Sequence, residues 1–257
     1  MIARTPGRMF GPVLRWQLLR MRRWIVTLVA FQLVVGIGVA FGLGNLLVAD
    51  DVAGRQYLVS GVATTVLLAT GLVLVPSLVF RARENGALEY LLLQQFPRPY
   101  LLLADLLIWT FVATPGAVAS VVLAAWHFDV ELSPSPLVIV AGVATIMVAV
   151  CSGYLLGLLA PSLAITNVVA NACLLFTLLY TPISFPSGNL EPWLVSAQKW
   201  LPSWYAADLL RRYYGLDSLA DFEPMVSWLI LGGWALALGT LATLLLTFPS
   251  RRITSVA

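Results

Sequence analysis

Long apolar blocks constrain this chain more than any other feature of its sequence. Because the hydrocarbon core of a bilayer is about 30 Å thick, a spanning helix needs roughly 20 consecutive apolar residues. Such blocks cover approximately residues 24–48, 57–80, 101–126, 137–159, 163–181 and 225–248. Only 11% of the residues are charged, against about 25% in an ordinary soluble domain. The pattern predicts an all-α membrane protein with six transmembrane helices.

Glycine and proline predict some details of these spans. The first span carries a set of small residues suited to close helix contact, either within the chain or with a second subunit: Gly36, Gly38, Gly42 and Gly44. Pro76 lies near the expected end of the second span. Pro115 and Gly116 are expected to break the third span.

The basic residues predict how the spans are oriented. An even number of spans places both termini on one side, together with the segment 81–100. That side holds 11 arginines: Arg4, Arg8, Arg15, Arg20, Arg22, Arg23, Arg81, Arg83, Arg98, Arg251 and Arg252. The other side holds four basic residues: Arg55, Lys199, Arg211 and Arg212. The positive-inside rule therefore places the termini in the cytoplasm, and residues 184–224 and the His127 loop outside.

Residues 1–23 precede the first span and are rich in arginine. Two compatible interpretations are open: an amphipathic helix lying in the membrane interface, or a positive flank that only fixes topology. The apolar block that follows is too long for the core of a signal peptide, so we expect it to be retained. The 14 arginines against one lysine indicate a GC-rich genome. The expected location is the plasma (inner) membrane of a bacterium.

The sequence lacks the motifs of several kinds of catalytic and metal-binding site. The phosphate-binding loop of ATPases needs a Gly-Lys-Ser/Thr end, and the only lysine, Lys199, follows Gln198. We therefore expect no bound cofactor or metal and no enzymatic activity in this chain. One histidine, His127, cannot supply a zinc-protease site. Cys151 and Cys173 lie in apolar blocks and are expected to be free thiols. A net charge of +3 gives no reason to expect nucleic-acid binding.

Few polar residues lie within the predicted spans. Asp105 sits near the start of the third span, where a helix-end acid with a polar partner is favoured over a proton relay. Asn167 and Asn171 are four residues apart and share one face of the fifth span. They either hydrogen-bond a neighbouring helix or line a substrate path.

The segment 81–100 is the one charged, amphipathic insert between two spans. As a helix over residues 84–96 it starts at Glu84, where an acid suits the helix dipole, and it places Leu88, Leu91 and Leu92 on one side. Pro97 and Pro99 then return the chain to the membrane. Such a helix can transmit a push from a cytoplasmic partner to the second and third spans. The alternative is a loop resting on the lipid headgroups.

At these residues the chain resembles the type-2 ABC exporter permeases, also called ABC-2 membrane subunits. The similar stretch reads Arg83-Glu84-x-Gly86-x-Leu88-Glu89-Tyr90-Leu91-Leu92, followed by Pro97-Arg98. It is similar to the family's coupling helix, although Ala87 stands where the family often has threonine. A second similar stretch reads Pro182-x-x-Phe185-Pro186-x-x-Asn189-Leu190-x-Pro192-Trp193-Leu194, then Leu201-Pro202 and Tyr205-Ala206-x-Asp208-x-Leu210-Arg211. It resembles the family's outward re-entrant region, expected here at residues 184–224, with Leu201 where the family usually has asparagine.

The resemblance implies a mechanism and a set of partners. Two permease subunits, identical or different, would form a path through the lipid membrane for an amphipathic substrate such as a drug, an antibiotic, a lipid or a lipid-linked glycan. Two ATPase subunits would bind ATP and Mg and drive the change from inward- to outward-facing. The residues that would dock into the ATPase are Glu84, Gly86, Leu88, Glu89 and Leu92. The aromatic residues that would shape the exit gate are Phe185, Trp193, Trp200, Trp204 and Tyr205. The competing hypothesis is an ATP-independent channel or secondary carrier.

Overall fold

The structure is a computed structural model that describes residues 25–44, 52–93, 98–181, 198–216 and 223–247, together with some isolated positions. All regular elements in this part are helical. In chain order they are α2 (Ile25–Ile37), η1 (Gly38–Leu43), α4 (Val52–Ala69), η2 (Thr70–Leu74), α5 (Val75–Glu84), α6 (Ala87–Leu93), α7 (Arg98–Phe128), α8 (Leu137–Leu159), α9 (Leu163–Tyr180), α11 (Pro202–Tyr213) and α12 (Pro224–Thr247). Within the described residues, six helical stretches are long and apolar enough to cross a membrane, as the sequence predicts.

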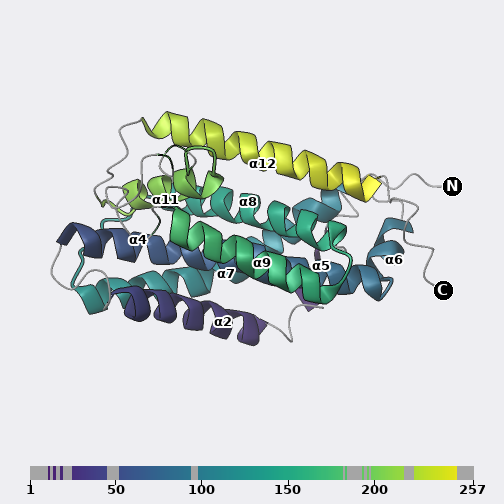
Figure 1. The fold of residues 1–257 in the computed structure, drawn as a ribbon, viewed down its shortest axis with the longest axis horizontal. Helices are drawn as coiled ribbons and strands as arrows, with labels where there is room; N and C mark the ends of the chain where they lie inside the picture. Colours follow the sequence, from purple (N-terminus) through teal and green to yellow (C-terminus); the bar gives the residue numbers. More distant parts are fainter. Residues whose placement is uncertain are drawn as a thin grey trace.

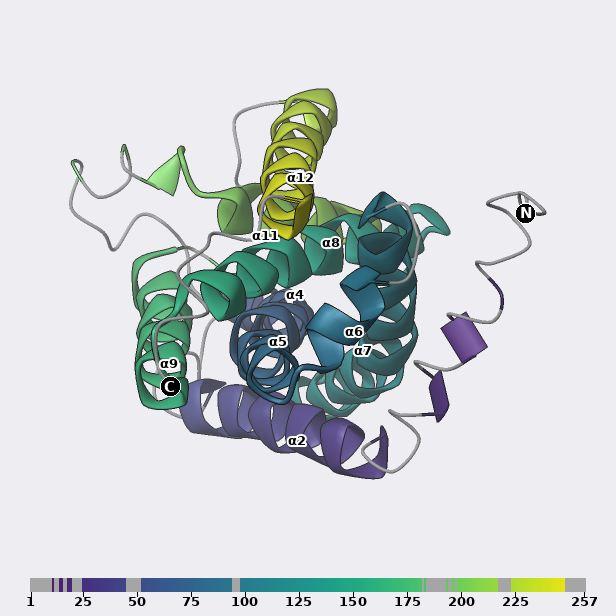
Figure 2. The same cartoon turned by 90° about the vertical axis from the view of Figure 1, so that its right-hand side faces the viewer.

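The second span forms the centre of the bundle. It runs from Val52 to Glu84 through α4, η2 and α5, and it is longer at both ends than the expected 57–80. Figure 2 shows it surrounded by α2, α7, α8 and α9, with α12 on the outer side of α8. The described side chains of α9 and α12 are mostly exposed. These two helices therefore have broad faces that nothing in the described chain covers.

The central helix passes Pro76 without ending. Five residues, Thr70–Leu74, form a wider π-turn directly before this proline. Proline lacks an N–H and its ring crowds the carbonyl four residues earlier, so a local π-turn is one way to keep the helix continuous. The turn also brings Gly71 against α8, where a Cβ atom added to Gly153 would lie 2.1 Å from the Gly71 carbonyl oxygen. Glycine at both positions permits this approach of two backbones.

The first and third spans pack through a reciprocal small-residue contact. A Cβ on Gly36 would meet the Ser120 side chain, and one on Gly116 would meet Gln32. Of the four glycines predicted to form a contact face, Gly36 and Gly44 meet neighbours within the chain, whereas Gly38 and Gly42 face open space.

The expected break at Pro115 is wrong, because α7 is continuous from Arg98 to Phe128. Neighbouring helices allow transmembrane helices to accommodate proline. Gly116 allows α2 to approach α7 at that level.

The elements outside the spans lie at opposite ends of the bundle. Figure 1 shows α6 at one end and α11 at the other, beside the far end of α4. The described start of α2 and the end of α12 lie at the α6 end. Most of the predicted interfacial helix 1–23 is outside the described residues. Two isolated positions in it, Leu14 and Leu18, pack against the core.

Candidate functional site

The α5–α6 connection is a tight turn at Asn85 and Gly86. The Asn85 N–H donates to the Arg81 carbonyl at 2.9 Å, and Gly86 has φ +69°. An L-residue other than glycine pays a steric cost in this left-handed conformation. A single helix over 84–96 starting at Glu84 is therefore wrong: Glu84 is the last residue of α5, and α6 spans Ala87–Leu93. Residues 94–97 lie outside the described part.

The apolar side of α6 faces the bundle. Leu91 is buried against Leu101 and Ala104 of α7, and Leu92 packs against the same cluster. Leu88 lines a small cavity that also contains the largely buried Asp105, in the second turn of α7. Two of the five predicted docking residues, Leu88 and Leu92, thus contact the chain's own helices, and Gly86 forms the turn.

The opposite side of α6 is exposed. It combines one acid with two large apolar side chains: Glu89, Tyr90 (61% exposed) and Leu93 (82% exposed). Glu84 is exposed nearby, at the end of α5. An acid beside exposed apolar groups on a short helix is the composition both of a protein-binding patch and of a helix that lies on lipid headgroups. Sequence reasoning missed Tyr90 and Leu93, because periodicity does not tell which side of a short helix faces its own bundle.

Two arginines hold α6 in position. The Arg83 guanidinium donates to the carbonyls of Leu158 and, at 2.7 Å, Ala160, at the C-terminal end of α8. Arg98, the first residue of α7, donates through Nη1 to the Leu92 carbonyl at 2.7 Å. Cations are favoured at helix C-termini, where the last carbonyls lack partners. The end of α5, directly before the turn into α6, is therefore tied to α8, and the end of α6 is tied to α7.

At the other end, α11 is almost entirely inside the protein. Nine of its 12 residues are buried, including Trp204 and Tyr205. The Tyr205 hydroxyl donates to the Lys199 carbonyl at 2.8 Å. Trp193 and Trp200 are exposed, and Phe185 lies outside the described residues. The structure thus separates the aromatic residues of the predicted exit gate into a buried pair and an exposed pair.

A buried charged cluster anchors α11. Arg211 donates to Ser60 Oγ and to the Ile183 carbonyl, both at 3.0 Å, and its guanidinium lies 3.5 Å from the centre of the Tyr57 ring. Burial lowers the pKa of Arg211 to about 10, while Tyr57 and Asp208 act in the opposite direction. The side chain therefore remains a cation at pH 7.

Asp208 provides the negative charge of this cluster. It pairs with Arg212 Nε at 2.9 Å and accepts a hydrogen bond from Ser227 of α12 at 2.7 Å. The cluster joins α11 to α4 and α12. From the sequence, Arg211 and Arg212 counted only as outward charges, because their partners lie far along the chain.

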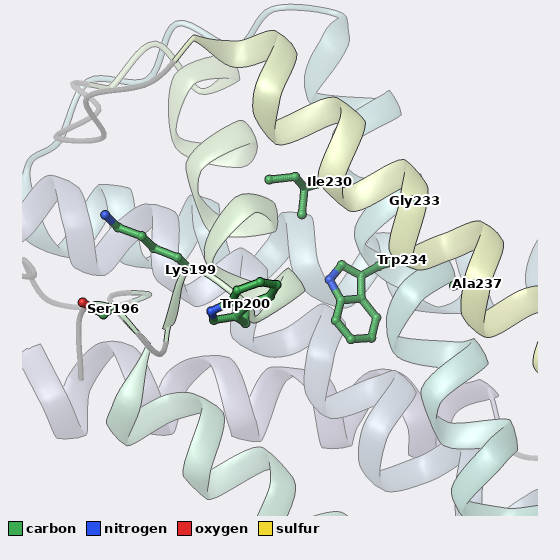
Figure 3. Close-up of a pocket in the computed structure, with 7 residues that line it drawn as sticks. All are labelled: Ser196, Lys199, Trp200, Ile230, Gly233, Trp234 and Ala237. Carbon is green, nitrogen blue, oxygen red and sulfur yellow. The ribbon is translucent and has the colours of Figure 1, made fainter. Parts of the chain in front are cut away.

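A groove of about 680 Å³ lies beside α11. Its walls are Trp200 and Lys199 on one side and Ile230, Gly233, Trp234 and Ala237 of α12 on the other. Figure 3 shows the Trp200 and Trp234 rings facing each other across it, while the Lys199 side chain extends away from Trp234. The small residues of α12 leave room for this groove, since a Cβ added to Gly233 would meet nothing within 4 Å. The groove is apolar with a single cation at its edge.

Asn167 and Asn171 both face outward from α9. Asn171 Nδ2 donates to the Asn167 carbonyl at 2.8 Å, so it satisfies a backbone group of its own helix. Within the described chain, neither amide forms a hydrogen bond with a neighbouring helix. Cys151 and Cys173 are free thiols, and in this part of the molecule no three His, Cys, Asp or Glu residues could hold a metal ion together.

Comparison with known families agrees with this architecture. A family described as "ABC-2 family transporter protein" matches residues 50–244, a stretch that includes α6, α11, four whole spans and most of the last span. No curated protein matches the chain. The matched stretch covers most of the sequence, and the chain therefore belongs to the ABC-2 family of transporter proteins.

Proposed function

We propose that this chain is the permease subunit of an ABC exporter, powered by a separate ATPase subunit that docks on α6. As an ABC-2 protein it is the membrane component of an ABC transporter. ATP and Mg bind to the ATPase partner, and this chain forms the path of the substrate through the membrane. The arginine count supports a bacterial plasma membrane with α6 and both termini in the cytoplasm.

The exposed side of α6 is the observation that carries this proposal. It presents Glu89, Tyr90 and Leu93 beyond the ends of the second and third spans. Ties to α7 and α8 hold the helix, so a push on this surface is transmitted to three spans and not absorbed by a loop. Exposed apolar patches mark sites of interaction with protein or membrane.

A second permease subunit is supported by α9. Polar side chains in membrane helices face protein or water far more often than lipid, because hydrocarbon offers them no hydrogen-bond partner. Asn167 and Asn171 face away from the chain's own bundle. A second copy or a paralogue across α9 would give both amides a polar environment, with a substrate path between the subunits.

The groove beside α11 supports an amphipathic substrate. Indole rings suit both apolar and interfacial groups, and Trp200 and Trp234 form opposite walls. We assign this groove to the outward end of the path, together with the exposed Trp193.

Docking can be tested by reversing charge and polarity on the exposed side of α6. We expect Glu89→Lys and Leu93→Asp each to reduce co-purification with the cognate ATPase and to abolish stimulation of its ATP hydrolysis by the permease. The matched control is Glu131→Lys, an exposed glutamate in the loop between α7 and α8 at the other end. Leu88→Asp is a poor test, because it would place a second carboxylate beside Asp105. Unchanged co-purification of both α6 variants would sink the docking proposal.

A further inference from the structure

A cavity of about 520 Å³ opens between α2 and α5 at the α6 end of the bundle. Its volume falls in the roughly 300–1,000 Å³ range of small-ligand sites. It exists because α2 packs on α4 and α7 but makes few contacts with α5. Figure 2 shows α2 passing beside α5 at the end of the bundle that faces the viewer. No role described above uses this cavity.

The cavity is apolar at one end and charged at the other. Leu28 and Phe31 of α2 face Leu74 and Leu78 of the central helix, and Arg81 and Asn85 complete the lining. Leu74 and Arg81 are seven residues apart, or about 10 Å along a helix with a 1.5 Å rise per residue. Arg81 lies three residues before the end of the span and Leu74 lies deeper. A lipid in the adjacent leaflet has the same order of polar and apolar parts.

The Arg81 side chain is the unused charge of this region. It is exposed, and within the described chain its guanidinium forms no hydrogen bond or ion pair. The nearby Arg83 is fully engaged with α8, and Arg98 with α6. A free guanidinium at the mouth of an apolar cavity suits a phosphate, which it can bind through two parallel hydrogen bonds.

We propose that this cavity binds an anionic glycerophospholipid from the adjacent leaflet, with its phosphate on Arg81 and an acyl chain between α2 and α5. Asn85 and Ala87 also line the cavity, so the bound lipid touches the turn that sets the position of α6. The lipid therefore forms part of the surface that holds the ATPase-docking helix in place. The identity of the leaflet and this consequence rest on the proposed function, whereas the binding itself does not.

Lipid binding can be measured on the purified full chain, without the ATPase, by native mass spectrometry. Equal amounts of dioleoyl-phosphatidylglycerol and dioleoyl-phosphatidylcholine are added, and the ratio of retained adducts is read. One arginine near a bilayer surface corresponds to about a fivefold preference for an anionic lipid. We expect Arg81→Gln to remove most of this preference and Arg81→Lys to keep it. Arg15→Gln removes the same charge from a segment predicted to lie on the same side of the membrane, outside the cavity, and should leave the ratio unchanged.

A second pair of variants tests the apolar part. Thr27→Trp adds an indole to the wall of the cavity and should reduce phosphatidylglycerol adducts severalfold. Its control, Val26→Trp, adds the same group to an exposed neighbour that does not line the cavity. An Arg81→Gln ratio equal to wild type, an equal loss in Arg15→Gln, or unchanged adducts in Thr27→Trp would each overturn the proposal. Because the readout involves no ATPase, failed docking of α6 would leave the result unaffected, and failed lipid binding would leave docking intact.

Discussion

The short helices at the two ends of the bundle, α11 and α6, differ in how much of their surface is buried. At one end, α11 buries nine of its 12 residues and satisfies its charges within the chain, through Asp208, Arg211 and Arg212. At the other end, α6 buries one of its seven residues and presents an acid, a tyrosine and a leucine. Both helices lie outside the six spans. Burial of α11 fixes the shape of that end, whereas α6 packs only one side on the bundle and leaves the other side exposed.

Because of this difference, substitutions at the α11 end should affect stability, whereas substitutions at the α6 end should affect the binding of a partner. Substitutions in the α11 cluster should change the free energy of unfolding, because they leave charges without partners inside the protein. Substitutions on the exposed side of α6 should change partner binding and leave unfolding unchanged. The following predictions test that separation.

The largest effect is expected at Asp208. Asp208→Asn removes the negative charge that faces Arg211 and Arg212, and removing one member of a buried charge pair costs about 3–5 kcal/mol. The double variant Asp208→Asn/Arg211→Leu also removes the stranded cation and should recover part of this loss. The free energy of unfolding in mixed micelles measures both. Glu89→Gln, on exposed α6, serves as the control and should not change it.

This account of the cluster would be contradicted if the two substitutions of the double variant lowered the free energy of unfolding by the sum of their separate effects. An Asp208→Asn protein as stable as Glu89→Gln would also contradict it, since it would mean that Arg211 does not depend on the carboxylate.

Two glycines with the same backbone conformation offer a matched comparison of the ends. Gly86 has φ +69° with open space around it, whereas Gly215, after α11, has φ +77° and would place a Cβ 2.9 Å from the Ser133 carbonyl oxygen. Alanine at either position pays about 1–2 kcal/mol for the left-handed conformation, and at Gly215 it pays a further 1–3 kcal/mol or so for overpacking. Unfolding measurements should therefore find that the Gly215→Ala variant is less stable than the Gly86→Ala variant.

Asparagine tolerates the left-handed region, so Gly86→Asn should be milder than Gly86→Ala. Equal losses at Gly86 and Gly215 would show that the α6 end is packed as tightly as the α11 end, and the comparison would fail.

The sequence predicts the spans well because hydropathy over 20 residues is a local property. The turn at Gly86 also had a local signal, since an Asn-Gly pair marks turns. Placing Glu84 at a helix start overlooked that signal. Hydropathy did not reveal that the central helix continues through Pro76, because the π-turn and the approach to Gly153 of α8 depend on a neighbour far along the chain.

The candidate site was less predictable for the same reason. Arg83 bonds carbonyls 75 and 77 residues away, and Arg211 bonds a serine 151 residues away. The resemblance to the ABC-2 coupling helix implies that Leu88 and Leu92, which share one apolar side of the helix, face the ATPase. An apolar side can equally face the chain's own bundle, and in this structure it does.

The smallest effect is expected at Arg98, and it should be local. Its hydrogen bond from a charged guanidinium to the Leu92 carbonyl is worth about 1.5–3 kcal/mol, and Leu91 is the only buried residue of α6. Arg98→Gln should therefore leave global unfolding almost unchanged but speed amide exchange of residues 87–93 by about tenfold or more, while exchange of residues 202–213 stays at the wild-type rate. Hydrogen exchange followed by mass spectrometry reads both segments in one sample. If amide exchange speeds up in both segments together, α6 opens only when the whole bundle opens and does not unfold separately. If only α6 responds, the docking helix is held by a few identifiable ties, and binding of the ATPase can then stabilise it without any change at the α11 end.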